Sequence, residues 1–158
     1  MPRTATLPET VTGAGLHYRA LEALYASAPV NRLFDSRLEI LGEGRSQIRF
    51  AVDERFHHAA GASHGTIYFK MLDDAAFYAA NTMVSDRFLL TTAFNLHFTK
   101  PIHTGEVVAE GRWVSGRRRV FIAEAHLTDA EGDEIGRGTG TFMRSHIALS
   151  GLPGYRIG

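Results

Sequence analysis

One helix constrains the fold of this chain more than any other segment. Residues 66 to about 83 follow a helical pattern and are apolar nearly all the way round. Such a helix is normally surrounded by protein rather than laid on a surface. The rest of the chain must therefore supply a layer that wraps around it.

The remaining elements are mostly strands. Apolar spacing from Leu16 to Phe34 predicts one short amphipathic helix that ends at Pro29, because proline cannot continue a helix. Alternating apolar residues within 38–52, on both sides of a glycine-rich turn, predict a β-hairpin. After the long helix we expect four strands, over residues 88–100, 107–114, 120–128 and 135–147.

This order of elements predicts an α+β domain with an antiparallel sheet. Strands and helices do not alternate in the way that a parallel sheet requires. One sheet curled around one apolar helix covers only part of that helix and leaves exposed strand edges. Pairing two copies edge to edge eases both problems. We therefore expect a homodimer as the minimum unit, with a dimer of dimers as the larger alternative.

Composition excludes several classes of protein. The 158 residues are 44% hydrophobic, which is enough for the core of one domain. The 17 basic residues balance 17 acidic ones, so no net field favours nucleic acid or a membrane surface. Cysteine is absent, which excludes disulfides, thiolate metal sites and a cysteine nucleophile. No apolar run approaches the roughly 18–20 residues that cross a bilayer.

The ends of the chain are expected to lie outside the domain. Residues 1–15 contain prolines and glycines but no apolar block, so they predict a flexible arm rather than a signal peptide. The domain is expected over residues 16–149, with a tail at 150–158. Together with the absence of cysteine, this pattern favours a cytoplasmic location.

Two adjacent carboxylates, Asp73 and Asp74, lie about two turns inside the long helix. The helix points them about 100° apart. Lys70 precedes Asp74 by four residues, which predicts a surface ion pair. Asp73 shares its stripe with Phe69 and Phe77 and should point to the apolar face, where charge is costly. Asp73 is therefore the candidate general base, and a carboxylate that only accepts hydrogen bonds from a loop is the alternative.

The start of the same helix offers a second chemical feature. A loop-to-helix junction presents unpaired backbone N–H groups at the positive end of the helix dipole, where an oxyanion could bind. Three histidines lie in the loop before it, at positions 57, 58 and 64. They lack the regular spacing of zinc ligands, so we expect no metal. We expect His64 to structure the loop and His58 to face the substrate.

Three consecutive arginines, Arg117, Arg118 and Arg119, lie at a predicted hairpin tip. Hairpin tips are solvated and often charged, so this run could be an ordinary solvated turn. Its functional interpretation is a cationic clamp for phosphate, because arginine can donate two parallel hydrogen bonds to a phosphate. One local clamp on a neutral protein fits a phosphorylated small molecule better than a nucleic acid.

From about residue 36 to 147 the chain resembles the hotdog-fold acyl-CoA thioesterases, particularly those of the phenylacetate-degradation type. Their motif is His-Gly-Gly before a helix that carries Asp or Glu nine positions after the His. Here His64-Gly65-Thr66 leads to Asp73 at that offset. The resemblance implies an antiparallel sheet wrapped around a long central helix, and it selects Asp73 over its neighbour.

The resemblance also implies roles for single residues. Asp73 would be the general base or the nucleophile, and the Gly65 N–H would polarise the thioester carbonyl. His58 takes the place of an amide side chain and would orient the thioester, while Thr91 would help to position water. The substrate and its coenzyme A would contact His64, Asn95 and the arginines at 117–119. No cofactor is implied beyond the coenzyme A of the substrate itself.

Two departures from the family pattern keep other functions open. Thr66 replaces the second glycine of the motif, and His58 replaces the amide. These changes leave room for a non-catalytic hotdog protein that binds acyl-CoA or another ligand. An enoyl-CoA hydratase of the same fold is a weaker alternative, because its Asp-x-Asn-Pro-x-His motif is absent. The sequence therefore predicts a thioesterase for small or medium acyl-CoA substrates that self-associates and binds neither nucleic acid nor membrane.

Overall fold

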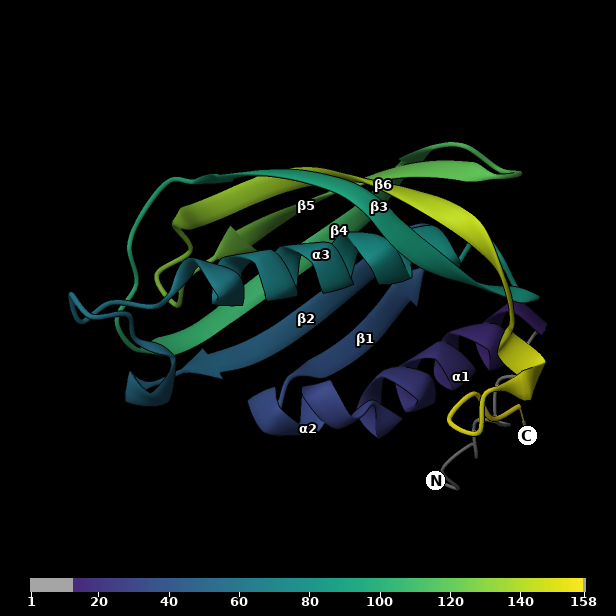
Figure 1. Ribbon diagram of the computed structural model, residues 1–158, viewed down its shortest axis with the longest axis horizontal. Coiled ribbons are helices and arrows are strands. Elements are labelled where there is room, and N and C mark those ends of the chain that lie inside the picture. Colours follow the sequence, from purple (N-terminus) through teal and green to yellow (C-terminus); the bar gives the residue numbers. More distant parts are fainter. Residues whose placement is uncertain (1–12, 158) are drawn as a thin grey trace, which may run out of the picture.

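The structure, a computed structural model, describes residues 13–157, and the predicted α+β architecture is confirmed over that range. Figure 1 shows a curved sheet with one long helix in its concave face and two shorter helices beside its first strand. The elements are α1 (Gly13–Ser27), α2 (Pro29–Phe34), β1 (Arg37–Gly42), β2 (Arg45–Val52), α3 (Gly65–Asn81), β3 (Arg87–Phe98), β4 (Gly105–Ser115), β5 (Val120–Thr128) and β6 (Glu134–Ala148).

The described strands form one antiparallel sheet in the order β1-β2-β4-β5-β6-β3. The hairpin and the four later strands lie close to the ranges that the sequence predicts. Because β3 crosses over to pair with β6, it forms one edge of the sheet and β1 forms the other. The long strand β3 therefore has β6 on one side and no described strand on its other side.

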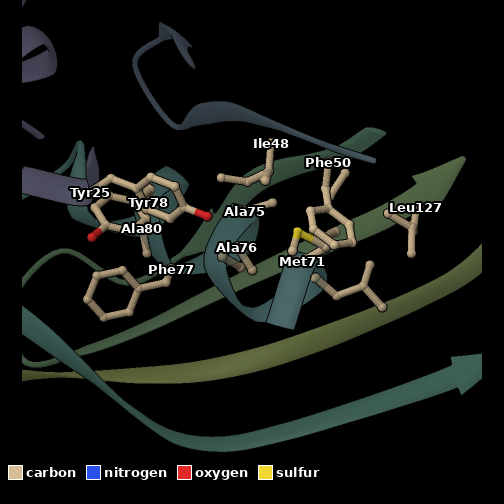
Figure 2. Packing of buried hydrophobic residues seen from close by; sticks show 14 of the residues in the cluster. Tyr25, Ile48, Phe50, Met71, Ala75, Ala76, Phe77, Tyr78, Ala80 and Leu127 are labelled. Carbon is tan, nitrogen blue, oxygen red and sulfur yellow. The ribbon is translucent and has the colours of Figure 1, made fainter. Parts of the chain in front are cut away.

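Helix α3 packs closely on the sheet because its inner face is built from small residues. Ala75, Ala76, Ala79 and Ala80 are fully buried, and Figure 2 shows Ala75 and Ala76 among larger side chains of the core. The closest approach is at Gly111 of β4, where an added Cβ would lie 2.0 Å from the carbonyl oxygen of Ala75. The apolar pattern of α3 is thus explained by burial against the sheet.

Pro29 begins a helix as well as ending one. The expected single helix is instead α1 followed directly by α2, whose first position is Pro29. Proline fits a first helical position because its fixed φ suits the helix and its missing N–H would have no partner there. Ala28 between the two helices is extended, with φ −67° and ψ 128°.

The C-terminal segment packs against α1. A short 3-10 turn at Leu149–Gly151 follows β6, and the buried Tyr155 hydroxyl lies 2.6 Å from Nδ1 of His17. The other ring nitrogen of His17 lies 2.9 Å from the carbonyl oxygen of Asn81 at the end of α3. Burial lowers the pKa of His17, which favours the neutral ring. Helix α1 begins at Gly13, and residues 1–12 of the expected arm lie outside the described range.

A bulge in β3 changes which of its side chains face α3. Thr91 pairs with Phe142 and Ala93 pairs with Thr141, so Thr92 is an extra residue in the strand. Before the bulge, Thr91 faces the helix; after it, Phe94 and Phe98 do, with their rings 5.6 Å from Phe69 and 5.3 Å from Tyr68. Successive side chains alternate between faces, so residues 95 and 97 lie on the outer face.

Among the described residues, no helix combines the length and the apolar character needed to cross a bilayer.

Candidate active site

Asp73 lies half-buried on α3, on the side of the helix that faces the edge strand. Thr91 of β3 donates a hydrogen bond from its hydroxyl to Oδ1 of Asp73 at 2.9 Å. The carboxylate opens into a cavity of about 300 Å³ whose walls include the apolar side chains of Phe77, Phe88 and Leu90. The structure thus brings together the two residues that the sequence assigns to base and water positioning.

The surroundings of Asp73 raise the pKa of its carboxyl towards neutral pH. Burial raises the pKa of its carboxyl to about 6, and the neighbouring charge of Asp74 adds to this rise. The hydrogen bond from Thr91 and the charge of Lys70 oppose the rise. A carboxylate with a pKa close to the working pH can take a proton from water and later return it.

Asp74 is not the surface residue that the helical spacing predicts. Its ion pair with Lys70 forms as expected, but the two side chains are only 19% and 14% exposed. The Tyr25 hydroxyl also donates to Asp74 at 3.2 Å, and Lys70 donates to Oδ1 of Asn31 at 2.6 Å. The prediction is wrong about burial because α1 and α2 cover this part of α3. Asp74 therefore joins three helices together.

The first N–H of α3 belongs to Gly65, and it has no acceptor among the described residues. The preceding His64 caps the helix, because its Nδ1 accepts a hydrogen bond from the Thr66 N–H at 3.0 Å. This cap satisfies the second N–H and leaves the first one open for an anion. His64 therefore structures the loop, and its predicted contact with substrate stays a prediction.

His58 lines the same depression as Gly65. Its Nδ1 accepts a hydrogen bond from the Ala60 N–H at 3.0 Å, and its ring is exposed. His58 and Gly65 line the same depression of about 440 Å³, together with Tyr68 and Phe98. The amide-replacing histidine and the candidate oxyanion donor therefore line the same depression.

Within one copy of the chain, Gly65 and Asp73 do not meet. They are eight residues apart on a straight run of helix, which corresponds to about 12 Å along its axis. The depression at Gly65 and the cavity at Asp73 share no lining residue. A thioester cannot contact both groups of the same copy at once.

Asn95 lies on the outer face of the sheet, away from Asp73. It lines a polar depression of about 240 Å³ with His97, Glu124 and Arg137. The bulge at Thr92 is the reason: without an extra residue, Asn95 would share a face with Thr91. The structure therefore does not bring Asn95 together with the other predicted site residues of the same copy.

The three arginines lie at the tip of the β4–β5 hairpin and are exposed. The guanidinium of Arg117 lies 4.7 Å from the centre of the Trp113 ring. Val120 pairs with Met143, and Met143 pairs with Leu90, next to Thr91. The tip is therefore at the Thr91 end of the sheet, two strands away from β3.

Among residues 13–157, one group of acidic or histidine side chains has metal-ligand spacing: Asp129, Glu131 and Asp133 in the β5–β6 turn. Lys100 fills this group, with its Nζ 2.9 Å from both Asp129 and Asp133. His57 instead lies with Nε2 2.6 Å from the carbonyl oxygen of His103. The acidic group is thus a lysine-centred ion-pair network.

Several residues around Asp73 have no signal in the sequence. Val30 of α2, Phe88 and Leu90 line its cavity, although they come from segments 43 residues before and about 15 after it. Their apolar character is typical of core residues. Only the packing of α2 and the register of β3 assign them to the site.

Two sequence comparisons relate this chain to known proteins. The sequence profile of the Thioesterase superfamily matches residues 60–135, which contain Gly65, Asp73 and Thr91. A protein of Saccharolobus solfataricus whose name describes it as an esterase is 26% identical over 105 residues, which cover 66% of this chain and 70% of that protein.

Solved structures share the fold. The PaaI protein of the Escherichia coli phenylacetic acid degradation operon superposes with a TM-score of 0.78 and 14% identity, covering 87% of this chain and 99% of that one. A thioesterase from Haemophilus influenzae gives 0.72 and 16%, with 81% and 90% covered. PaaI from Thermus thermophilus gives 0.68 and 21%, with 75% and 100% covered. The predicted resemblance is confirmed: this chain has the hotdog fold and, over residues 60–135, the sequence pattern of the Thioesterase superfamily.

Proposed function

We propose that this protein hydrolyses acyl-CoA thioesters at sites built from two copies of the chain. The observation that carries the proposal is Asp73, a carboxylate with a pKa of about 6 in an apolar cavity, held by Thr91. Hydrolysis of a thioester needs a base of that kind, and Asp73 lies nine positions after His64, the offset that the resemblance to hotdog thioesterases assigns to the catalytic carboxylate.

Two copies would complete the site through their β3 edges. The long edge strand is flanked by large apolar side chains that are unusually exposed, with Phe69 at 41%, Leu90 at 46% and Phe98 at 58%. Thr91 and Asp73 lie towards one end of β3, while Phe98 lies at its other end against Gly65. Antiparallel pairing of two β3 strands exchanges these ends. Asp73 of one copy then faces Gly65 and His58 of the other.

The chemistry follows from these positions. The thioester carbonyl oxygen accepts a hydrogen bond from the Gly65 N–H of one copy, which stabilises the negative charge that forms on it. Asp73 of the other copy removes a proton from water as the water oxygen bonds to the carbonyl carbon. The C–S bond then breaks, and the departing thiolate takes up the proton that Asp73 received from water. Direct attack by Asp73, followed by hydrolysis of the anhydride, gives the same products.

The direct test is a panel of acyl-CoA substrates that spans aryl, short-chain and long-chain acyl groups. Hydrolysis is followed by the release of free thiol, and binding is followed by mass spectrometry of the intact protein. Thiol release with at least one acyl-CoA supports the proposal. Binding of acyl-CoA without any hydrolysis would instead favour a non-catalytic binding protein.

Self-association is the first prediction. We expect light scattering at micromolar concentration to give at least twice the 17.4 kDa mass of one chain. The physical reason is the exposed edge of β3 with its apolar flank. A protein that is monomeric under assay conditions and still hydrolyses acyl-CoA would contradict the two-copy site.

A second prediction concerns pH. Asp73 must be ionised to act as a base, so kcat/KM should rise tenfold per pH unit below about 6 and level off above it. Thr91→Val removes a hydrogen bond that favours the charged form. Its acidic limb should therefore move to higher pH. A pH–rate profile that is identical in wild type and variant would show that Thr91 does not act on the base.

A third prediction tests the arginines. If the tip at 117–119 binds coenzyme A phosphates, Arg118→Glu should mainly raise KM, because those contacts are equal in the ground and transition states. The effect should shrink at high salt, since exposed charges are screened over about 10 Å at 0.1 M. A truncated thioester without the nucleotide serves as the control. Equal losses with the full and truncated substrates would remove the arginines from the binding site.

A further inference from the structure

The cavity at Asp73 continues into a larger one. The second cavity has a volume of about 580 Å³ and lies between α1, the start of α2 and the C-terminal segment. The two cavities share Ala28, Tyr78 and Phe88 as lining residues. The walls of the second cavity also include Tyr78 of α3, Phe88 of β3 and Ile147 of β6, and the C-terminal segment (yellow in Figure 1) lies beside α1. The two cavities therefore adjoin, and Asp73, the candidate base, lines the first of them.

We call these two adjoining cavities the channel: the first is lined by Asp73 and Asp74 among apolar residues, and the second is lined mainly by apolar residues and by two arginines. Leu24, Phe88, Ile147 and Leu152 line the second cavity, and none of its lining residues within the described range 13–157 is acidic. Two arginines, Arg32 of α2 and Arg156 of the C-terminal segment, line the same cavity. Two cations at the end of an apolar channel favour an anion there.

The two arginines have free hydrogen-bonding capacity. Arg32 donates from Nη2 to the Ser27 carbonyl at 3.0 Å, and Arg156 donates from Nε to the Pro153 carbonyl at 3.4 Å. Neither forms an ion pair with an acidic residue in the described part of the chain. A guanidinium carries five N–H donors, so each arginine can still donate to a carboxylate.

We propose that this channel holds the acyl chain of the substrate and that Arg32 and Arg156 bind a carboxylate at the far end of that chain. The inference rests on the proposed thioesterase function and specifies its substrate class as ω-carboxyacyl-CoA. Asp73 and Tyr78 are five residues apart on α3, about 7.5 Å along the helix; Tyr78 lines both cavities, whereas the two arginines line only the second. Short diacids such as succinate are too short to span this distance.

The test compares two substrates of equal chain length, decanoyl-CoA and its ω-carboxy counterpart decanedioyl-CoA. We expect wild type to prefer decanedioyl-CoA by about tenfold in kcat/KM, in line with a charge-assisted contact at the end of an apolar pocket. Arg32→Gln with Arg156→Gln should abolish that preference and leave decanoyl-CoA within about twofold. Arg37→Gln, an exposed arginine outside the channel, is the matched control.

Three results would overturn the inference. One is equal kcat/KM for the two substrates in wild type. Another is an equal loss on both substrates in the double variant, since the arginines would then hold coenzyme A rather than the acyl end. The third concerns Ala28→Leu. The larger side chain narrows the space where the two cavities adjoin, so this variant should hydrolyse decanedioyl-CoA more slowly than wild type but acetyl-CoA at the same rate. Equal rates for this variant and wild type would show that the chain takes another path.

A separate binding experiment tests the channel if the protein proves not to be a thioesterase. If no acyl-CoA is hydrolysed, calorimetry with free decanedioate and free decanoate decides the inference alone. Tighter binding of decanedioate that depends on Arg32 and Arg156 supports the channel, and equal binding of the two acids contradicts it.

Discussion

Asp73→Asn is expected to lower kcat by at least about a hundredfold, because it removes the only base that the proposed mechanism uses. The fold should persist, since the two side chains are nearly the same shape. Above pH 6 the variant should be at least as stable as wild type: burial raises the pKa of Asp73 to about 6, so its ionisation costs stability in the folded state. Thiol-release kinetics and thermal unfolding at pH 8 measure both effects.

Asp74→Asn, at the neighbouring position, is the matched control: we expect it to lower stability and to leave turnover nearly unchanged. It removes the negative charge opposite the largely buried Lys70 and leaves that ammonium group without its counter-ion, so it should lower Tm by roughly 5 °C. Its kcat should stay within a few-fold of wild type, because Asp73 is retained. Undiminished turnover in Asp73→Asn would remove Asp73 from the mechanism, whatever Asp74→Asn does.

Gly65→Pro should reduce kcat by about a hundredfold or more, because proline deletes the N–H that faces the developing oxyanion. The backbone can accept this change. Gly65 is the first position of α3, where proline is favoured, and the preceding His64 has φ −63° and ψ 145°, a conformation that a following proline permits. The loss should therefore appear in kcat with little change in Tm.

Gly65→Ala is the control, because it keeps the N–H. Its added Cβ would lie 3.1 Å from the ring of Phe98, an exposed side chain that can move aside. The variant should therefore retain most of its activity. Equal losses in the alanine and proline variants would mean that the contact with Phe98, and not the N–H, is what matters.

Mixing the two inactive variants tests the two-copy site. If Asp73 of one copy acts with Gly65 of the other, a hybrid of Asp73→Asn and Gly65→Pro chains contains one intact site. Random co-assembly then restores about a quarter of wild-type activity, since about half of the dimers are mixed and each has one of two sites. If Asp73 and Gly65 act within one copy, no hybrid has an intact site and activity stays at the background of the two variants.

The sequence alone determined the main elements and the candidate base. The apolar pattern of α3 indicated a helix that needs a sheet around it. Alternation indicated the hairpin at 38–52, and turn residues between apolar segments indicated the four later strands. Helical geometry and the His64-Gly65 motif both selected Asp73. These conclusions depend on local periodicity and fixed offsets within one helix, which a sequence displays directly.

Only the tertiary structure decided how these parts meet. One inserted residue, Thr92, turned Asn95 to the outer face, and nothing in the alternation of β3 reveals a bulge. Packing of α1 and α2 buried Asp74, which helical spacing alone placed at the surface. Register and packing also joined Ala28 and Phe88 to the cavity of Asp73. Such contacts depend on the distances between segments far apart in the chain, which local patterns do not encode.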